Sequence, residues 1–341
     1  MQEEGSNRAK ILLTTGIHEK LIIGDHFSAF NTHVFRIADL GCSVGPNTFA
    51  SVKTIVEAVE HKYRNEGLDS QIPEFQVFFN DHFANDFNTL FNSLPSQRPY
   101  MAAGVPGSFH HKLFPKASMN FMHSSFATHW LTKVPEEVTK QDSSAWNKGS
   151  ITYVGGSSKV VEAYRAQYFK DMEGFFRVRS VELAENGLLV LLIPCRPEGS
   201  HPSESALMNI IDRLGYALHD MAKEGVISEA LIDSFNVPIY YPTPDEVKEV
   251  VSSNECLSIE ISEVSCYPKN LRTPEDARVY SLLGRSTLEG ILCKHFGSEV
   301  IDELFERYTQ KLEEFSKTPF FNSVETFAEL FLLVKRIAVS Q

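Results

Sequence analysis

The sequence has few cysteines, no excess of positive charge and no long hydrophobic run, and each shortage excludes a class of protein. The five cysteines are odd in number and include no Cys-x-x-Cys spacing, so neither a disulfide framework nor a zinc site is indicated. With 32 basic against 44 acidic residues, the net charge of −12 argues against nucleic acid, which binds chiefly through phosphate neutralisation. A small anionic ligand remains compatible with this charge, because a pocket can be locally positive.

Targeting and membrane signals are also missing. The first residues lack the apolar core of a secretory signal, and no run approaches the roughly 20 apolar residues that span a bilayer. The apolar share of 43% and the charged share of 22% are ordinary for a soluble globular protein. We therefore expect a soluble, cytoplasmic protein whose 341 residues form one large domain or a core with a cap.

The most informative segment is 35–48, where an apolar run ends in Asp39, a glycine turn follows, and a helix begins. In an open α/β sheet this junction lies at the carboxyl end of a strand, where ligands bind. Gly41 and Gly45 have the spacing Gly-x3-Gly, and not the Gly-x-Gly-x-x-Gly that accommodates a pyrophosphate. A nucleoside without phosphates suits this turn better, and S-adenosylmethionine is the commonest such ligand.

Hydrophobic periodicity predicts a βαβ unit at the start of the chain. Strands are expected at about 34–40 and 74–81, with an amphipathic helix between them and a right-handed crossover. The second strand, like the first, ends in an acid, Asp81. Another short buried strand is expected at 120–124, and the clearest parallel strand is 187–193.

Helical patterns dominate the second half. A long helix before the 187–193 strand is expected to end near Gly187, a plausible helix-ending glycine. Thr243 to Glu246 has the form of a helix start with a capping box. The other expected elements are a helix around 208–218, an edge strand at 257–264, helices within 272–318 and a closing helix or strand at 327–339. These elements form a doubly wound sheet with helices stacked as a lid.

Four segments, taken in order, resemble the motifs of the plant SABATH methyltransferases. They are Asp39-Leu-Gly-Cys-Ser-Val-Gly-Pro-Asn47-Thr, Asn80-Asp81-His-Phe-Ala-Asn85-Asp86-Phe87-Asn88, Gly104-Val-Pro-Gly-Ser108-Phe109 and His123-Ser-Ser-Phe126-Ala-Thr-His129-Trp130-Leu. This family methylates salicylate, benzoate, jasmonate, indole-acetate and related acids, and xanthines in its caffeine branch. The resemblance runs from about residue 34 to the C-terminus.

The resemblance implies an α/β, Rossmann-like class I methyltransferase fold with a helical cap, and a homodimer. Residues 1–200 would form mainly the cofactor-binding core, 201–320 the cap and pocket elements, and 321–341 an element that returns to the core. The implied function is S-adenosylmethionine-dependent formation of the methyl ester of a small carboxylic acid. Methyl transfer to an ionised acid needs neither a metal nor a general base, so no catalytic side chain is expected.

The resemblance also assigns the binding residues. Asp81 can accept hydrogen bonds from both ribose hydroxyls, and Phe109 would lie against the adenine. The residues expected around the cofactor are Asp39, Gly41, Cys42, Asn47, Asp81, His82, Ser108 and Phe109. Those expected around the acceptor are Phe126, His129 and Trp130. The indole N–H of Trp130 suits a carboxylate oxygen, whereas His129 contributes either a donor or only shape. Salicylate-preferring relatives tend to have methionine at this position, which favours another acid here.

Two further segments resemble those that hold a Mg²⁺ ion in this family. The ligands would be oxygens of Asn147, Asp233 and Asn236 and the backbone carbonyl of Phe235. Two hydrogen-bonded turns explain the same residues equally well. The ion is given no catalytic part.

The chain departs from the family pattern in two places. Relatives carry a Ser-Tyr-x-x-Asn-Ser-x-x-Gln segment some thirty residues before the first motif, and the 38 residues before Asp39 contain no match to it. His82 stands where leucine is usual. The departures predict weaker cofactor binding and lower activity. They leave two alternatives open beside the leading function: an N-methyltransferase of the xanthine type, and a catalytically weak or silent member. A dinucleotide-dependent dehydrogenase is disfavoured by the glycine spacing.

Overall fold

A seven-stranded sheet forms the centre of the molecule, which the computed structural model describes over residues 2–23, 33–268, 273–318 and 326–338. In spatial order the strands are β3 (Tyr100–Pro106), β2 (Glu74–Asp81), β1 (Val34–Leu40), β4 (Met119–Ser125), β5 (Leu183–Cys195), β7 (Thr326–Arg336) and β6 (Leu257–Pro268). The first five strands are parallel, and β7 runs antiparallel to both of its neighbours. The strand order reverses between β1 and β4, and in open α/β sheets ligands bind at the carboxyl edge of such a switch point.

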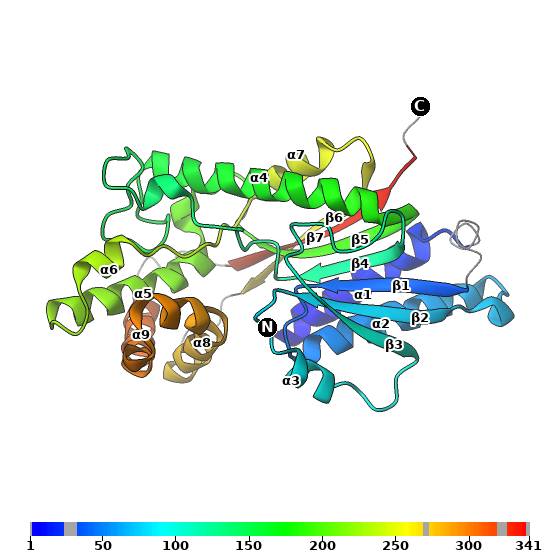
Figure 1. The fold of residues 1–341 in the computed structure, drawn as a ribbon, viewed down its shortest axis with the longest axis horizontal. Helices are drawn as coiled ribbons and strands as arrows, with labels where there is room; N and C mark the ends of the chain where they lie inside the picture. The colour runs from blue at the N-terminus through cyan, green and yellow to red at the C-terminus, as the bar shows by residue number, and fades with distance from the viewer. Residues whose placement is uncertain (1, 24–32, 269–272, 319–325, 339–341) are drawn as a thin grey trace.

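Helices cover both faces of the sheet. Figure 1 shows α1 (Gln2–Lys20) and α2 (Pro46–Asn65) on one face, and α4 (Ser158–Glu182) and α7 (Pro244–Ser252) on the other. The short helix α3 (Phe87–Asn92) follows β2. Single turns of 3₁₀ helix occur at Asp69–Gln71, Glu136–Val138, Pro202–Glu204 and Ser298–Val300. Each face buries its own apolar cluster, so the sheet lies between two cores.

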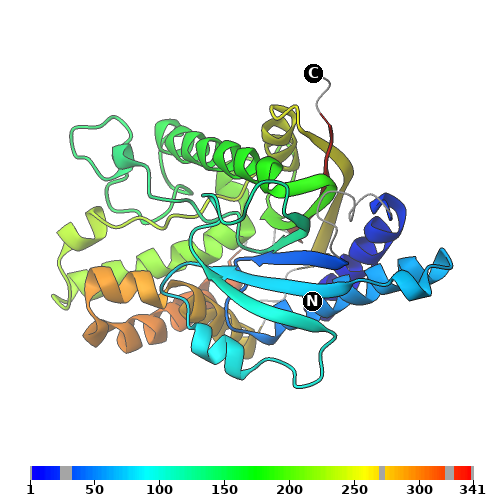
Figure 2. The same cartoon turned by 45° about the vertical axis from the view of Figure 1, so that its right-hand side comes forward.

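A second group of helices lies beyond the end of the sheet toward which the arrows of β1 and β4 point (Figures 1 and 2). It consists of α5 (Ala206–Lys223), α6 (Glu229–Asp233), α8 (Pro274–Phe296) and α9 (Ile301–Ser316). The hydroxyl of Tyr308 in α9 donates to the Ile210 carbonyl in α5 at 3.1 Å, which joins the group internally. No helix in the described part of the chain is long and apolar enough to cross a bilayer.

Several sequence predictions are confirmed. The strands β1, β2, β4, β5 and β6 all occur, β6 as the edge strand, and α2 follows β1 as expected. The capping box at the start of α7 is present: Thr243 Oγ1 accepts the Glu246 N–H at 3.2 Å, and Glu246 Oε2 accepts the Thr243 N–H at 2.9 Å.

The predicted end of the long helix is wrong. The helix α4 ends at Glu182, and Gly187 lies inside β5. A Cβ at Gly187 would lie 2.9 Å from the Ala184 carbonyl oxygen and 3.2 Å from that of Asn120, so the glycine serves a close approach of two backbones. The closing element is the strand β7, inserted between β5 and β6, while residue 339 lies outside the described residues. Within 201–320, β6 belongs to the sheet and not to the helical group.

Candidate functional site

The turn after β1 lies at the carboxyl edge of the sheet and is held against the end of β2. The backbone N–H groups of Gly41 and Cys42 both donate to the Asn80 carbonyl at 2.9 Å. Gly41 has a φ of +80°, which residues with a Cβ rarely adopt. A Cβ at Gly41 would also lie 2.5 Å from that of Ala127 and 3.6 Å from a ring carbon of Phe109. The turn therefore meets the loop after β3 and the segment after β4 at one point.

Asp81, the acid at the tip of β2, faces this turn and keeps acceptor capacity. Its carboxylate oxygens accept the backbone N–H groups of Ser43 at 2.8 Å and His82 at 2.7 Å. The side chain is 14% exposed, and each carboxylate oxygen has a second lone pair. Asp81 can therefore accept hydrogen bonds from a diol such as a ribose. The His82 ring is exposed, with Nε2 3.6 Å from the same carboxylate.

Asp39, the acid at the tip of β1, is buried and bonded inside the protein. One oxygen lies 2.7 Å from Nδ1 of His123 on the neighbouring strand β4. The other oxygen accepts the hydroxyl of Thr48 in α2. The Asp39 side chain therefore ties the start of α2 to the sheet. The sequence did not single out His123, because the contact joins residues 84 positions apart.

Cys42 lies within the glycine turn, and Asn47 follows it in the first turn of α2. Burial, with added contributions from Asp39 and Asp81, raises the pKa of the Cys42 thiol far above its ordinary range. The thiol is therefore uncharged, and its Sγ donates to the Ser43 carbonyl at 3.4 Å. Asn47 is exposed in the first turn of α2, where a helix N-terminus presents free backbone N–H groups.

The loop after β3 carries Ser108 and Phe109 and is bonded to the tip of β2. The Gly107 N–H donates to the Asp81 carbonyl at 2.8 Å. The Phe109 ring is half-buried and packs edge-on against Phe175 of α4, with centroids 6.0 Å apart and an interplanar angle of 88°. An aromatic ring in this place can pack on a nucleobase.

Phe126, His129 and Trp130 follow β4 directly and lie within one turn of chain. Phe126 has a φ of +52° and is 50% exposed. The buried His129 ring stacks on Tyr241, with centroids 5.4 Å apart and planes 13° apart. Trp130 is half-buried and forms an isolated β-bridge with Ile239. A ligand at this turn would meet aromatic side chains from two separate segments.

The side chains of His129 and Trp130 are both electrically neutral. Burial lowers the pKa of His129 to about 3, so its ring carries no charge at neutral pH. Within the described part of the chain, His129 Nδ1 is buried and has no hydrogen-bond partner. The indole N–H of Trp130 is a donor without acceptor capacity. The turn therefore offers an anionic ligand the neutral indole N–H of Trp130.

The segment that carries Tyr241 is bonded along the same turn. The Leu131 N–H donates to the Pro238 carbonyl at 2.8 Å, and the Tyr240 N–H donates to the His129 carbonyl at 3.0 Å. The sequence prediction missed Tyr241. The available signal is weak, a Tyr-Tyr-Pro run between two helices, and it shows nothing of the histidine that the second tyrosine faces.

The two segments named for Mg²⁺ do lie together, but hydrogen bonds between protein atoms join them. The Asn147 amide donates to Asn236 Oδ1 at 2.7 Å, and the Gly149 N–H donates to Asp233 Oδ1 at 2.8 Å. Phe235 packs against aromatic neighbours. Among the described residues, no group of three or more His, Cys, Asp and Glu side chains is placed to hold a metal ion. As arranged, these residues do not fit a cation unless those bonds are displaced.

Comparison with known proteins adds to this geometry. A family model described as "SAM dependent carboxyl methyltransferase" matches residues 1–336. Loganic acid O-methyltransferase of Catharanthus roseus is 42% identical over 332 residues, which cover 96% of this chain and 87% of that protein. Farnesoic acid carboxyl-O-methyltransferase of Arabidopsis thaliana is 41% identical over 285 residues, 84% of this chain and 81% of that protein. Caffeine synthase 1 of Camellia taliensis is 36% identical over 293 residues, with coverage of 82% and 79%.

A solved structure has the same architecture. The structure titled "Loganic acid methyltransferase with SAH" superposes with a TM-score of 0.89 at 41% identity, covering 97% of this chain and 93% of that one. The fold is therefore the α/β class I methyltransferase fold, and the site described above belongs to it.

Proposed function

This chain belongs to the SABATH family of S-adenosylmethionine-dependent carboxyl methyltransferases, and from that membership we propose how its residues divide between cofactor and acid. The enzyme transfers a methyl group from S-adenosylmethionine to a carboxylate oxygen. The cofactor would contact Gly41, Cys42, Asn47, Asp81, His82, Ser108 and Phe109, while Asp39 acts behind them. The acid would contact Phe126, His129 and Trp130.

The close approach of three segments at Gly41 supports this division of residues between cofactor and acid. The glycine turn approaches Phe109 on one side and Ala127, next to Phe126, on the other. A cofactor whose ribose is held by Asp81 and whose adenine packs on Phe109 would pass over the glycine turn. Its reactive end would then lie beside the segment that carries Trp130. One binding edge thus serves both ligands.

The reaction needs orientation more than side-chain chemistry. The cofactor supplies a methyl group activated by its positive sulfonium. A carboxylate oxygen attacks that carbon opposite the sulfur, the C–O bond forms as the C–S bond breaks, and the sulfur keeps the electron pair. The acid is already ionised at neutral pH, so no side chain has to remove a proton. Holding the three atoms in line can supply most of the rate enhancement.

The acceptor would be a small carboxylic acid with an aromatic or isoprenoid-type body. Trp130, Tyr241 and the half-exposed Phe126 give the turn an aromatic lining that suits an apolar body. The indole N–H of Trp130 suits the carboxylate, and His129 contributes either a donor or only shape. Two relatives are named for loganic and farnesoic acids, which are acids of this kind.

A screen with methyl-labelled S-adenosylmethionine tests the function. Loganic, farnesoic, salicylic, benzoic and indole-acetic acids would be offered beside xanthines, and a labelled methyl ester is expected. Trp130→Ala should raise the KM of the best acid about 10- to 100-fold, the value of one hydrogen bond to a charged group. Label on xanthine nitrogen alone would favour the N-methyltransferase alternative. Cofactor binding without any transfer would favour a silent family member.

The Mg²⁺ ion and the homodimer also stay predictions. Calorimetric titration with Mg²⁺ would detect an ion bound between Asn147 and Asp233. Asp233→Asn should abolish any such binding. An ion would have to displace the hydrogen bonds that now join these residues, so a heat of binding supports the site and its absence overturns it. Light scattering on the purified chain tests the dimer, for which a mass of twice 38.4 kDa is expected.

A further inference from the structure

The helix α4 bonds to the loops on both sides of the site. Near its C-terminal end, Arg179 donates to the carbonyl of Phe109 at 3.0 Å and to that of His111 at 2.8 Å. One turn later, Glu182 accepts the backbone N–H groups of Leu113 at 2.5 Å and Phe114 at 2.9 Å. These four bonds fix the whole loop that carries the Phe109 ring.

The two charged groups that hold this loop also form a pair. Arg179 and Glu182 lie 2.7 Å apart, and both side chains are 0% exposed. Two charges out of water are tolerated when their remaining hydrogen-bonding capacity is satisfied. The backbone of the Phe109 loop supplies four such bonds, although Arg179 Nε is buried without a partner among the described residues, so the pair and the loop depend on each other.

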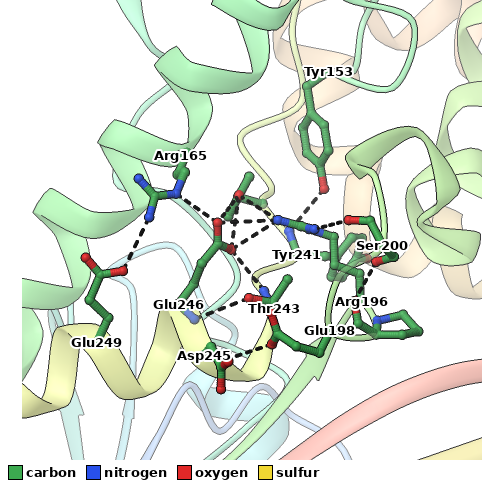
Figure 3. A network of polar contacts seen from close by, with 12 residues as sticks. Tyr153, Arg165, Arg196, Glu198, Ser200, Tyr241, Thr243, Asp245, Glu246 and Glu249 are labelled. Atoms are coloured by element: carbon green, nitrogen blue, oxygen red, sulfur yellow. Dashed lines mark hydrogen bonds and ion pairs between the residues drawn. The ribbon is translucent and has the colours of Figure 1, made fainter.

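The other half of α4 is bonded to the acceptor side through Glu246. Arg165 of α4 donates to Glu246 Oε1 at 2.9 Å, and the Tyr240 hydroxyl donates to the same oxygen at 3.0 Å. The Thr243 N–H donates to the other oxygen at 2.9 Å (Figure 3). Glu246 is therefore bonded to the chain on both sides of Tyr241, the residue that stacks on His129.

Two more contacts support the same segment. Arg196, at the end of β5, donates to both Glu246 oxygens at 3.3 Å. The Tyr241 N–H donates to the Tyr153 hydroxyl at 3.2 Å (Figure 3). Glu246 and its partners thus hold the Tyr240–Tyr241 segment in place. None of these partners is among the residues expected to contact a ligand.

We propose that α4 is a two-ended positioning helix, in which the Arg179–Glu182 pair places Phe109 for the cofactor and the Arg165–Glu246 pair places Tyr241 for the acid. The inference rests on the proposed function, because it takes Phe109 and the His129 turn as the two binding regions. The two anchors lie about 21 Å apart along the helix axis, at 1.5 Å per residue. At this separation we expect each anchor to act mainly on its own ligand.

The test measures two affinities on each variant. Calorimetry gives the Kd of S-adenosylhomocysteine, and a second titration gives the Kd of the best acid in the complex with that product. Arg179→Met should weaken S-adenosylhomocysteine about tenfold and change the acid less than about twofold, with Arg179→Lys intermediate. Glu246→Gln should show the reverse, weakening the acid about tenfold and sparing S-adenosylhomocysteine.

Controls keep a folding defect apart from a positioning defect. Arg177→Met changes an exposed arginine on the same helix and should alter neither Kd. If Arg179→Met does not fold, Glu182→Gln tests the same anchor with an isosteric side chain. If Glu246→Gln does not fold, Arg165→Met tests the acceptor anchor from a side chain that is 45% exposed.

Two kinds of failure are distinguishable. Folded variants that weaken both ligands equally, or neither, overturn the two-ended assignment while the parent enzyme still methylates an acid. A parent enzyme that binds S-adenosylhomocysteine but no acid overturns the proposed function, while the Arg179 variants still decide the cofactor half.

Discussion

Asp39 and His123 are register partners on the adjacent parallel strands β1 and β4, and their side chains meet with Oδ1 and Nδ1 2.7 Å apart. Both residues are buried, and the second Asp39 oxygen accepts the Thr48 hydroxyl. The acid at the tip of β1 is therefore a structural group, whereas the acid at the tip of β2, Asp81, is partly exposed. Both strand-tip acids bond to the glycine turn or the helix after it, and we expect only the partly exposed Asp81 to contact a ligand as well.

Alanine substitution should separate these two roles. Asp39→Ala leaves His123 and Thr48 without their buried partner and should lower the free energy of unfolding by about 3 kcal/mol. Asp81→Ala should cost only about 1 kcal/mol but weaken S-adenosylhomocysteine by more than tenfold. Urea unfolding and calorimetry give the two quantities. The division is contradicted if Asp81→Ala is the more destabilising change.

The sequence allowed β1, β2 and β4 to be predicted because each contains buried apolar residues within an ordinary strand length. The edge strand β3 was missed, because Tyr100–Pro106 is half-exposed and contains small residues in place of an apolar alternation. The place of β7 between β5 and β6 could not be predicted, since pairing between distant segments leaves no local pattern. The helix α1 was also missed, because its residues show no clear apolar stripe.

For the site, the sequence supplied the groups expected to touch ligands, because motifs lie on contiguous chain. The sequence did not indicate the residues that hold those ligand-contacting groups in place. Arg179 lies 70 positions from the Phe109 carbonyl that it holds, and Tyr240 lies 111 positions from the His129 carbonyl to which it donates. Such contacts follow from topology and not from local composition.

Gly41, where the turn after β1 meets Phe109 and Ala127, allows a test of the proposed cofactor position. Gly41→Ala places a Cβ 2.5 Å from that of Ala127 and imposes a φ of +80° on a residue that disfavours it by about 1–2 kcal/mol. We expect the turn to move and S-adenosylhomocysteine affinity to fall about 100-fold. Gly45→Ala is the matched control, since Gly45 has a φ of −88° and no atom within 4 Å of the added Cβ.

Calorimetry gives the Kd of S-adenosylhomocysteine for both alanine variants. The control should bind within about threefold of the parent, because an exchange of glycine for alanine at a helix N-cap affects stability only modestly. Equal losses in the two variants would show that the glycines matter for flexibility alone and that the contact with Ala127 is irrelevant.

His129 should make the protein less stable in mild acid. Its pKa is about 3 in the folded state because it is buried, against about 6.5 in an unfolded chain. Between these values the unfolded chain binds a proton that the folded protein does not, so the free energy of unfolding falls as the pH falls. The contribution of His129 should be about 2 kcal/mol smaller at pH 5 than at pH 7.5.

His129→Gln removes that titration while keeping a polar side chain of similar size. Urea unfolding at the two pH values should show a weaker loss of stability in the variant than in the parent. An unchanged loss would mean that the imidazole reaches solvent and is protonated in the folded protein.

Glu329 should act in the opposite direction and at higher pH. Burial in β7 between Pro194 and Ser265 raises the pKa of its carboxyl from the ordinary 4.5 to about 7. Between pH 4.5 and 7 the folded state holds the proton and the unfolded chain releases it, so stability is lost as the pH rises. The loss from pH 5 to pH 8 should be about 2–3 kcal/mol.

Glu329→Gln replaces the protonated carboxyl with a neutral group of the same shape. The variant should therefore be more stable than the parent at pH 8 and nearly equal to it at pH 5, as measured by urea unfolding at both values. Glu263→Gln, on the exposed face of the neighbouring strand β6, should keep the pH dependence of the parent. If the two glutamine variants behave alike, the Glu329 carboxyl is ionised in the folded protein at neutral pH, and its burial is compensated by a partner strong enough to hold the charge.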